Sequence, residues 1–351
     1  MNWSTAFFAG DEHPDHHKPL DGLRGLAVLF VILGRAANHG LGPFELDSVM
    51  VRGKLGVYLF FVLSAYLLDR QIIRMFQEGR ANWNYWLYYL SRRFLRIFPL
   101  FFVALIVFRM SNAAGLKVVI HSWGQIWEHL ILQRGDHIFW SIPVEFKYYL
   151  LSPILLFFFH RYLKWNKLAM GITLTVIICS VFIGQSFFNQ SRINVFLYLN
   201  IFLMGTLVAI LERCFPMSWN TMSKWKLTKY SGWLVVLVFV IWSKQVVNFK
   251  DPHTFLPAAA LWSIALAATF GPGWWASLLS FKPLRWVGKV SFSMYLFHIP
   301  VLMWVKTWAI PSGPLWFIYL GLTALVCAAT FLLIERPLQQ FKPFTYGPKS
   351  A

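Results

Sequence analysis

Long apolar runs with few charges recur along the whole chain. Residues 171–187, 233–243 and 315–334 carry almost no charge. About 20 apolar residues in a helix span the hydrocarbon core of a bilayer. The pattern therefore predicts an all-α polytopic membrane protein with about ten transmembrane helices around a central cavity. The expected spans are residues 22–40, 55–73, 94–110, 142–160, 168–187, 194–211, 231–248, 255–271, 292–310 and 314–334.

Composition and charge support this interpretation. Charged residues make up 13% of the chain and hydrophobic residues 58%, whereas soluble domains carry about 25% charged residues. The formal net charge of +18 would suggest nucleic acid in a soluble protein. Here most Lys and Arg outside the spans lie in the N-terminal tail, alternate loops and the C-terminus, which share one side of the membrane. This bias predicts cytoplasmic termini, with membrane lipids rather than nucleic acid as the partner.

The chain shows no internal repeat and no linker that would separate two domains. We therefore expect a single transmembrane domain over residues 1–351, with a short tail at 1–19 and no appended soluble domain. Cys179, Cys214 and Cys327 form neither a disulfide framework nor a metal-ligand spacing, so no metal site is expected. Residues 111–141 contain Trp123, Trp127 and Trp140, which predicts an interfacial amphipathic helix anchored by aromatic rings.

The first expected span carries two arginines in otherwise apolar sequence. Arg24 and Arg35 are eleven residues apart, which is about three turns and roughly 16 Å of rise, so both project from one helix face. Arg24 lies near the cytoplasmic end, from which a long side chain can reach the interface. Arg35 lies deeper, where a charge indicates a functional site. His39 follows one turn later on nearly the same side, unless it belongs to the outer loop.

Two further charged positions lie inside expected spans. Glu145 and Lys147 follow Pro143 at the start of the span at 142–160. An acid in an apolar span predicts a functional site, although the helix dipole also favours an acid near an N-terminus. His298 lies in the first half of the span at 292–310. It either takes part in chemistry or bonds a neighbouring helix for packing.

The longest basic connection, residues 69–96, has two interpretations. Its arginines either anchor the topology or hold a phosphorylated ligand, because guanidinium groups pair bidentately with phosphate. The grouping of three arginines just before Pro99 favours the ligand. The arginines are Arg70, Arg74, Arg80, Arg92, Arg93 and Arg96.

Six short motifs stand in order along the chain: Leu20–Gly25, Gly56–Leu67, Arg92–Pro99, Trp140–Tyr149, Ser291–Pro300 and Glu335–Pro337. Together they resemble the membrane-bound acyltransferase 3 family, which O-acylates cell-surface carbohydrates. Ala65 stands where the family usually has Gly. The resemblance covers nearly the whole chain, and the combination of six motifs in order is far more specific than any one of them.

The resemblance implies an O-acyltransferase of the bacterial inner membrane. The acyl group, usually acetyl from acetyl-coenzyme A (acetyl-CoA), comes from the cytoplasm. It passes to a hydroxyl of a polysaccharide or lipid-linked glycan, such as the O-antigen of lipopolysaccharide. No metal is implied.

The first span departs from the family at one position. The family motif is Arg, ten residues, then a His regarded as the catalytic base or acyl relay; here Arg24 matches the Arg and Arg35 occupies the His position. Arginine stays protonated and offers no lone pair, so Arg35 cannot act as a base. Either the chain is a natural or engineered variant with reduced or absent activity, or His39 replaces the base, or no side-chain base is needed. We expect the first.

The resemblance and the chemistry together assign roles. Arg24 and the donor-binding arginines Arg70, Arg92, Arg93 and Arg96 would hold the coenzyme phosphates, and Glu145 would orient the base or the acceptor. The remaining site candidates, some of them donors to an oxyanion, are Trp140, Ser141, Lys147, Tyr148, Ser291, Tyr295 and His298. Two other functions stay open: a transporter or flippase, since charged residues also line transport pathways, and a relative that binds the donor without catalysis.

Overall fold

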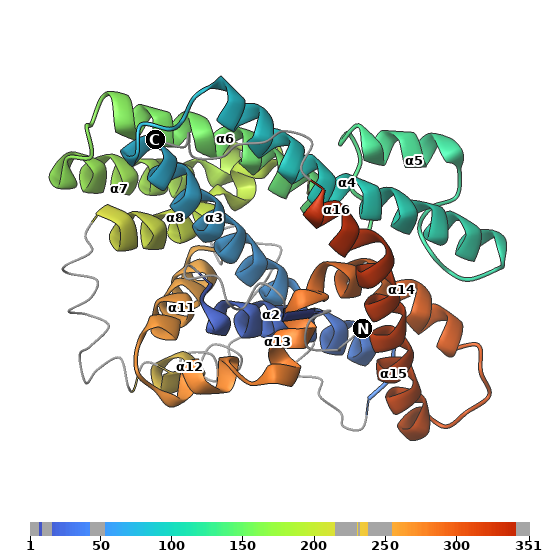
Figure 1. Ribbon diagram of the computed structural model, residues 1–351. Coiled ribbons are helices and arrows are strands. Elements are labelled where there is room, and N and C mark those ends of the chain that lie inside the picture. The colour runs from blue at the N-terminus through green and yellow to red at the C-terminus, as the bar shows by residue number, and fades with distance from the viewer. Residues whose placement is uncertain are drawn as a thin grey trace.

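The computed structural model describes residues 7–8, 16–42, 53–214, 230, 232–237 and 255–341. Within these ranges the regular structure is entirely helical, and no strand occurs (Figure 1). The long helices are α2 (Lys18–Asn38), α3 (Gly53–Gln77), α4 (Trp83–Ala113), α6 (Ser141–Arg161), α7 (Lys167–Gly184), α8 (Leu199–Cys214), α11 (Phe255–Ala267), α14 (Ser291–Val305) and α15 (Ser312–Thr330). The short elements are α5 (Trp123–Leu130), η1 (Gln185–Phe187), η2 (Val195–Tyr198), η4 (Ala268–Phe270), α12 (Trp274–Leu279), α13 (Lys282–Lys289), η5 (Phe331–Glu335) and α16 (Arg336–Gln340).

The all-helical class is confirmed for the described residues, but ten transmembrane helices are not. Six helical segments there are long and apolar enough to cross a membrane. The expected spans at 255–271 and 292–310 appear as the shorter apolar helices Phe255–Phe270 and Ser291–Val305. Of the expected span at 231–248, residues 232–237 are helical, and the rest lies outside the described residues. The six segments are Gly53–Gln77, Trp83–Ala113, Ser141–Arg161, Lys167–Phe187, Val195–Cys214 and Ser312–Gln340.

Helix α2, the first expected span, forms but is not among those six. Three charged residues, Asp21, Arg24 and Arg35, interrupt its apolar sequence. The helix tolerates them because it is enclosed by protein: it packs against α3, α12, α13 and α14. Figure 1 shows α2 in the interior, between α3 and α13. A helix that is surrounded by other helices does not need the uniformly apolar surface that lipid requires.

Two glycines of the Leu20–Gly25 motif explain how closely α2 approaches its neighbours. A Cβ added to Gly22 would lie 1.8 Å from the Leu279 carbonyl oxygen, and one added to Gly25 would lie 2.2 Å from the Leu284 oxygen. Both obstacles are backbone atoms, so a side chain could be accommodated only by moving α2 away from the α12–α13 segment. Small residues of this kind allow helix backbones to touch in membrane proteins.

Replacing Gly25 with leucine is expected to destabilise the protein. Because the new side chain must displace backbone, we expect the melting temperature in detergent to fall by roughly 5 °C or more. Gly321→Ala is the matched control, since Gly321 lies in α15 and a Cβ added there would meet nothing within 4 Å, and alanine favours helix. An unchanged melting temperature for Gly25→Leu would contradict the close approach.

The connection between α4 and α6 contains the predicted amphipathic helix. It is α5, which starts at the N-cap Ser122 and leaves Trp123 and Trp127 each 64% exposed. These two rings are suited to anchor the helix at the membrane interface. Trp140 differs from the expectation: it is buried, with its ring 4.9 Å from the ring of Tyr198. Its place at the beginning of α6 directs it into the core.

Candidate active site

Two cavities lie side by side in the protein and share part of their lining. The inner cavity lies among α2, α3, α4, α6 and α14. The second cavity is bounded by the start of α2, the ends of α3 and η5, and α16, and we call it the vestibule. Arg24, Arg96 and Leu67 line both cavities. The two spaces therefore meet at these three residues.

Two arginines and nearby carboxylates lie at the junction between the cavities. Arg24 interacts electrostatically with Arg96 and with the carboxylates of Asp21, Glu145 and Glu335, and Arg96 also interacts with Glu335. Glu145 belongs to the inner cavity, and Glu335 belongs to the vestibule. Neither arginine forms a hydrogen bond with a described residue, so both guanidinium groups keep their donors for a ligand. The sequence-predicted Arg24 thus lies where a molecule passing from one cavity to the other must come.

Glu145 is held in the wall of the inner cavity by two hydroxyl groups. Ser64 on α3 and Tyr149, one turn further along α6, both donate hydrogen bonds to its Oε1 atom. No described residue donates to Oε2. This arrangement fixes the side chain and leaves one carboxylate oxygen to accept a proton or a hydrogen bond from a substrate. Ser64 and Tyr149 were not among the sequence-predicted site residues, although both lie inside motifs that the sequence contains.

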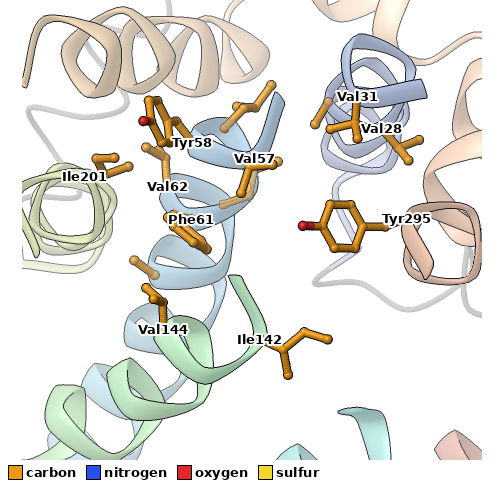
Figure 2. Close-up of a cluster of buried hydrophobic side chains, with 14 of the residues drawn as sticks. Val28, Val31, Val57, Tyr58, Phe61, Val62, Ile142, Val144, Ile201 and Tyr295 are labelled. Atoms are coloured by element: carbon orange, nitrogen blue, oxygen red, sulfur yellow. The ribbon is translucent and has the colours of Figure 1, made fainter. Parts of the chain in front are cut away.

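Three other predicted residues line the inner cavity from α6 and α14: Ser141, Ser291 and Tyr295. The Tyr295 hydroxyl donates to the Ile138 carbonyl and lies 2.9 Å from the Ser141 hydroxyl. Figure 2 shows the Tyr295 ring projecting from its helix into the space facing α3 and α6, toward Val57 and Ile142. The Ser291 hydroxyl is buried and has no hydrogen-bond partner among the described residues. It is therefore a free donor at the cavity wall.

The vestibule is lined by basic side chains, including three of the predicted donor-binding arginines. Arg70 and Arg92 lie there with Arg96, and Lys289 and Arg336 join them. Arg70 donates from Nε to Glu212 at 3.0 Å, and Tyr66 donates to the same carboxylate. The residue pattern alone did not single out Glu212, which holds Arg70 in place.

Arg92 and Arg93 differ from the simple expectation of two phosphate-binding groups. Arg92 donates hydrogen bonds to the carbonyls of Gln339 and Phe341 and thereby joins α4 to the end of α16. Arg93 lines the inner cavity instead, with its guanidinium 5.6 Å from the centroid of the Tyr149 ring. Arg74 and Arg80 line neither cavity, and both pair with Glu78.

Glu335 enters the vestibule wall through an irregular stretch of helix. The segment Phe331–Glu335 (η5) is a π-helix, and such turns are frequent at functional sites. Ser293 and Gln339 donate to the two carboxylate oxygens of Glu335, each at 3.0 Å. Its charge faces Arg24 and Arg96. The closing motif of the sequence contained Glu335, but nothing in the residue pattern indicated a π-helical turn.

Several predicted residues lie outside both cavity linings. Tyr148 is buried and donates to Asp69, which also accepts from Ser152 and Thr206, so this group joins α3, α6 and α8. Lys147 donates to the Ile193 carbonyl at 2.9 Å.

The remaining predicted residues lie toward the other end of α2. Arg35 interacts electrostatically with Tyr295 and with Arg192, next to the inner cavity but not in its lining. His39 ends α2, and its carbonyl accepts a hydrogen bond from Lys306. His298 is fully buried, with Nδ1 near the Met294 and Tyr295 carbonyls and with Nε2 unpartnered among the described residues.

The arrangement is a basic vestibule that leads past Arg24 and Arg96 to an inner cavity with a fixed carboxylate, Glu145, and one free hydroxyl donor, Ser291. Such a site can hold an anionic molecule by one end and present its other end to a base and to hydrogen-bond donors. Among the described residues, no group of three His, Cys, Asp or Glu side chains could hold a metal ion.

Comparison with known proteins agrees with this geometry. The family model described as "Acyltransferase domain" matches residues 18–335, so the chain belongs to that family of acyltransferases. With its apolar helices, it is an integral membrane protein.

Individual relatives include an O-acetyltransferase OatA of Staphylococcus aureus (strain NCTC 8325 / PS 47), which is 25% identical over 96% of this chain and 60% of its own length. The peptidoglycan O-acetyltransferase OatA of Listeria monocytogenes serovar 1/2a is 24% identical over 92% of this chain and 55% of its own length. The chain thus spans little more than half the length of these relatives. No solved structure matches it.

Proposed function

We propose that this chain is an O-acetyltransferase that moves an acetyl group from acetyl-CoA to a hydroxyl of a cell-surface glycan. The observation that carries the proposal is the meeting of the basic vestibule and the inner cavity at Arg24 and Arg96. The vestibule offers the charge that a coenzyme with several phosphates requires. The inner cavity offers a carboxylate and hydroxyl donors to the acyl end. Family membership makes acyl transfer the chemistry to test.

In the proposed reaction, the donor phosphates bind Arg70, Arg96 and their basic neighbours in the vestibule. The acetyl thioester passes between Arg24 and Arg96 into the inner cavity. The oxygen of the acceptor hydroxyl attacks the thioester carbonyl carbon, and Glu145 Oε2 accepts the hydroxyl proton. The carbon–sulfur bond then breaks, and the leaving coenzyme thiolate takes that proton. The products are the acetyl ester and free coenzyme A.

The Ser291 hydroxyl is the proposed donor to the oxyanion of the tetrahedral intermediate. It lines the inner cavity, is buried, and is free of partners among the described residues. A donor that is already fixed in a dry site stabilises developing charge without reorganisation. Tyr295 donates its proton to the Ile138 carbonyl, so it serves to shape the cavity wall beside Ser291.

Glu145 also offers a fourth account of the arginine at position 35. Neither Arg35 nor His39 lines the inner cavity, whereas Glu145 does. In our proposal the chain is active, and Glu145 performs the proton transfer for which position 35 is unsuited. The reduced activity expected from the sequence remains a competing prediction.

The acceptor and the topology are part of the proposal. The name of the Listeria relative refers to peptidoglycan, so a cell-wall glycan is the first acceptor to test and the O-antigen of lipopolysaccharide the second. The relatives are bacterial. We propose the bacterial plasma membrane as the location, with both termini cytoplasmic and the vestibule open to cytoplasmic acetyl-CoA.

The test is acetyl transfer by the purified protein in proteoliposomes, with labelled acetyl-CoA outside and glycan acceptor supplied on either side. We expect labelled O-acetyl ester, and Arg35→His should not raise the rate. A tenfold or greater gain in Arg35→His would instead favour the reduced-activity prediction. Binding of acetyl-CoA without transfer in both proteins would indicate a non-catalytic relative. Glycan movement without acetyl-CoA binding would indicate a transporter or flippase.

A further inference from the structure

A second group of basic side chains gathers at the end of the protein opposite the vestibule. Arg35 lies in the last turn of α2, His137 lies just before α6, and Arg192 lies in the connection before η2. His137 interacts electrostatically with Arg35, Arg192 and His39. We call Arg35, His137 and Arg192 the outer basic cluster. It is assembled from three segments that are distant in sequence.

Packing between the loops fixes the members of the cluster relative to one another. A Cβ added to Gly135 would lie 2.5 Å from Ile193, so the backbone of the His137 loop runs against the residue after Arg192. Lys147 on α6 donates to the Ile193 carbonyl at 2.9 Å and holds the same connection. Lys306, at the end of α14, donates to the His39 carbonyl at 2.8 Å and adds another cation beside the end of α2. These contacts hold together the segments that carry the cluster.

The described residues contain no carboxylate that balances the cluster. Among the described residues, Arg35 interacts electrostatically with Tyr295, Arg192 and the three histidines His39, His137 and His298, and the groups that interact with His137 are basic. The acids in the adjacent loop, Glu128 and Asp136, both pair with Arg134.

The lowered pKa of His137 agrees with this excess of positive charge. Burial, followed by the neighbouring charges of Arg35, His39 and Arg192, lowers the pKa of His137 to about 4. Its Nδ1 atom is buried without a partner among the described residues. His137 is therefore uncharged at neutral pH, and the charge of the cluster comes from Arg35, which is partly buried, and from Arg192, which is exposed. A cation that is partly removed from water without a counter-charge is stabilised by a bound anion.

The position of the cluster indicates which molecule would bring that anion. Arg35 interacts with Tyr295, whose ring lines the inner cavity. The cluster therefore lies beside the inner cavity, on the side away from the vestibule through which the donor would enter. A molecule that approaches from this side and extends a hydroxyl toward Glu145 would pass the cluster.

We infer that the outer basic cluster binds an anionic group, a carboxylate or a phosphate, on the glycan acceptor. The inference rests on the proposed function and narrows its substrate class to negatively charged glycans. It also gives Arg35 a role that a histidine could not fill equally well, because arginine keeps its charge at every physiological pH and pairs with two oxygens at once.

The test compares two matched oligosaccharides that differ in charge alone. Tetragalacturonate and the tetragalactose made by reducing its carboxyls are titrated into the detergent-solubilised protein by calorimetry. We expect the charged sugar to bind at least about tenfold more tightly, which is the value of one charge-assisted hydrogen-bonded pair. Arg192→Gln and Arg35→Gln should each remove most of this preference. Lys117→Gln, an exposed cation elsewhere in the outer loop, should retain it.

Other outcomes would overturn the inference. Equal binding of the two sugars, or binding of neither, excludes an anion-selective acceptor site. If phosphatidylglycerol in micelles bound at the cluster and tetragalacturonate did not, the cluster would be assigned to a lipid headgroup. A tenfold gain in tetragalacturonate affinity after Glu45→Gln with Asp47→Asn would show that acids of this chain supply the counter-charge. Acetyl-CoA binding is measured in every preparation. If the unmutated protein does not bind acetyl-CoA, the proposed function is refuted. If it binds acetyl-CoA but shows no preference for the charged sugar, only the inference about the acceptor fails.

Discussion

Replacing Arg24 with alanine is expected to weaken acetyl-CoA binding by about 10- to 100-fold, which corresponds to the loss of one or two hydrogen bonds from a charged donor. Arg24 lines both cavities and faces Arg96 across their junction. Its guanidinium makes no hydrogen bond with a described residue, so its loss removes hydrogen bonds to the ligand rather than hydrogen bonds to described residues. The measurement is calorimetric titration of the detergent-solubilised protein with acetyl-CoA.

The matched control for Arg24→Ala is Arg80→Ala. Arg80 belongs to the same basic connection as the donor-binding arginines, but it lines neither cavity and pairs with Glu78. The affinity of the Arg80→Ala protein for acetyl-CoA should stay within about twofold of the unmutated value, because the loss of a surface ion pair has only a small effect. Unchanged affinity in Arg24→Ala would exclude the junction from the donor site.

Replacing Glu145 with glutamine is expected to lower the rate constant of acetyl transfer by roughly 10²- to 10⁴-fold, the range that a positioned general base supplies. Glutamine has nearly the same shape and can still accept from Ser64 and Tyr149 through its amide oxygen. The amide nitrogen cannot accept a proton at the position of Oε2. The steady-state rate is measured with saturating acetyl-CoA and glycan, together with the affinity for acetyl-CoA.

Two comparisons separate proton transfer from a general loss of structure. Acetyl-CoA affinity in Glu145→Gln should change by less than about threefold, because Arg24 keeps Arg96 and Glu335 as neighbours. Glu128→Gln removes a carboxylate from the connection between α4 and α6, where it pairs with Arg134, and should leave the rate unchanged. If Glu145→Gln transferred acetyl at the original rate, a group other than Glu145 would have to accept the proton of the acceptor hydroxyl.

Most of the fold could be predicted from the sequence because helices that cross a membrane must be long and apolar. Helices α4, α7 and α15 are exposed at the protein surface over much of their length, and each contains an apolar stretch of membrane-spanning length. Helix α2 shows the limit of that rule. It is enclosed by other helices, so its charged residues indicate internal cavities, and its sequence does not show the apolar length of a membrane span. Its glycine contacts could not be predicted, because they depend on the carbonyls of Leu279 and Leu284, about 260 residues further along the chain.

The candidate site was predicted in part, for a similar reason. Arg24 and Glu145 were found because an isolated charge in an apolar segment is conspicuous. Ser64 and Glu212 carry ordinary polar groups near charged neighbours, and only the packing of α3 against α6 and α8 shows that they hold Glu145 and Arg70. Tyr148 was a candidate by its place in a motif. Its hydroxyl instead binds Asp69, which lies on a different helix.

Because of the π-helical turn at Phe331–Glu335, the positions of the site residues after it depend on the number of residues in the final span. A π turn contains one residue more than a regular α-helical turn. Deleting a single residue before it, with the π turn retained, would rotate every later position by about 100° relative to the preceding helix. Glu335 and Arg336 would then leave the vestibule together. The lipid-facing positions of α15 are therefore free to exchange one apolar residue for another, whereas the number of residues between Ser312 and Glu335 is fixed by the chemistry at its end.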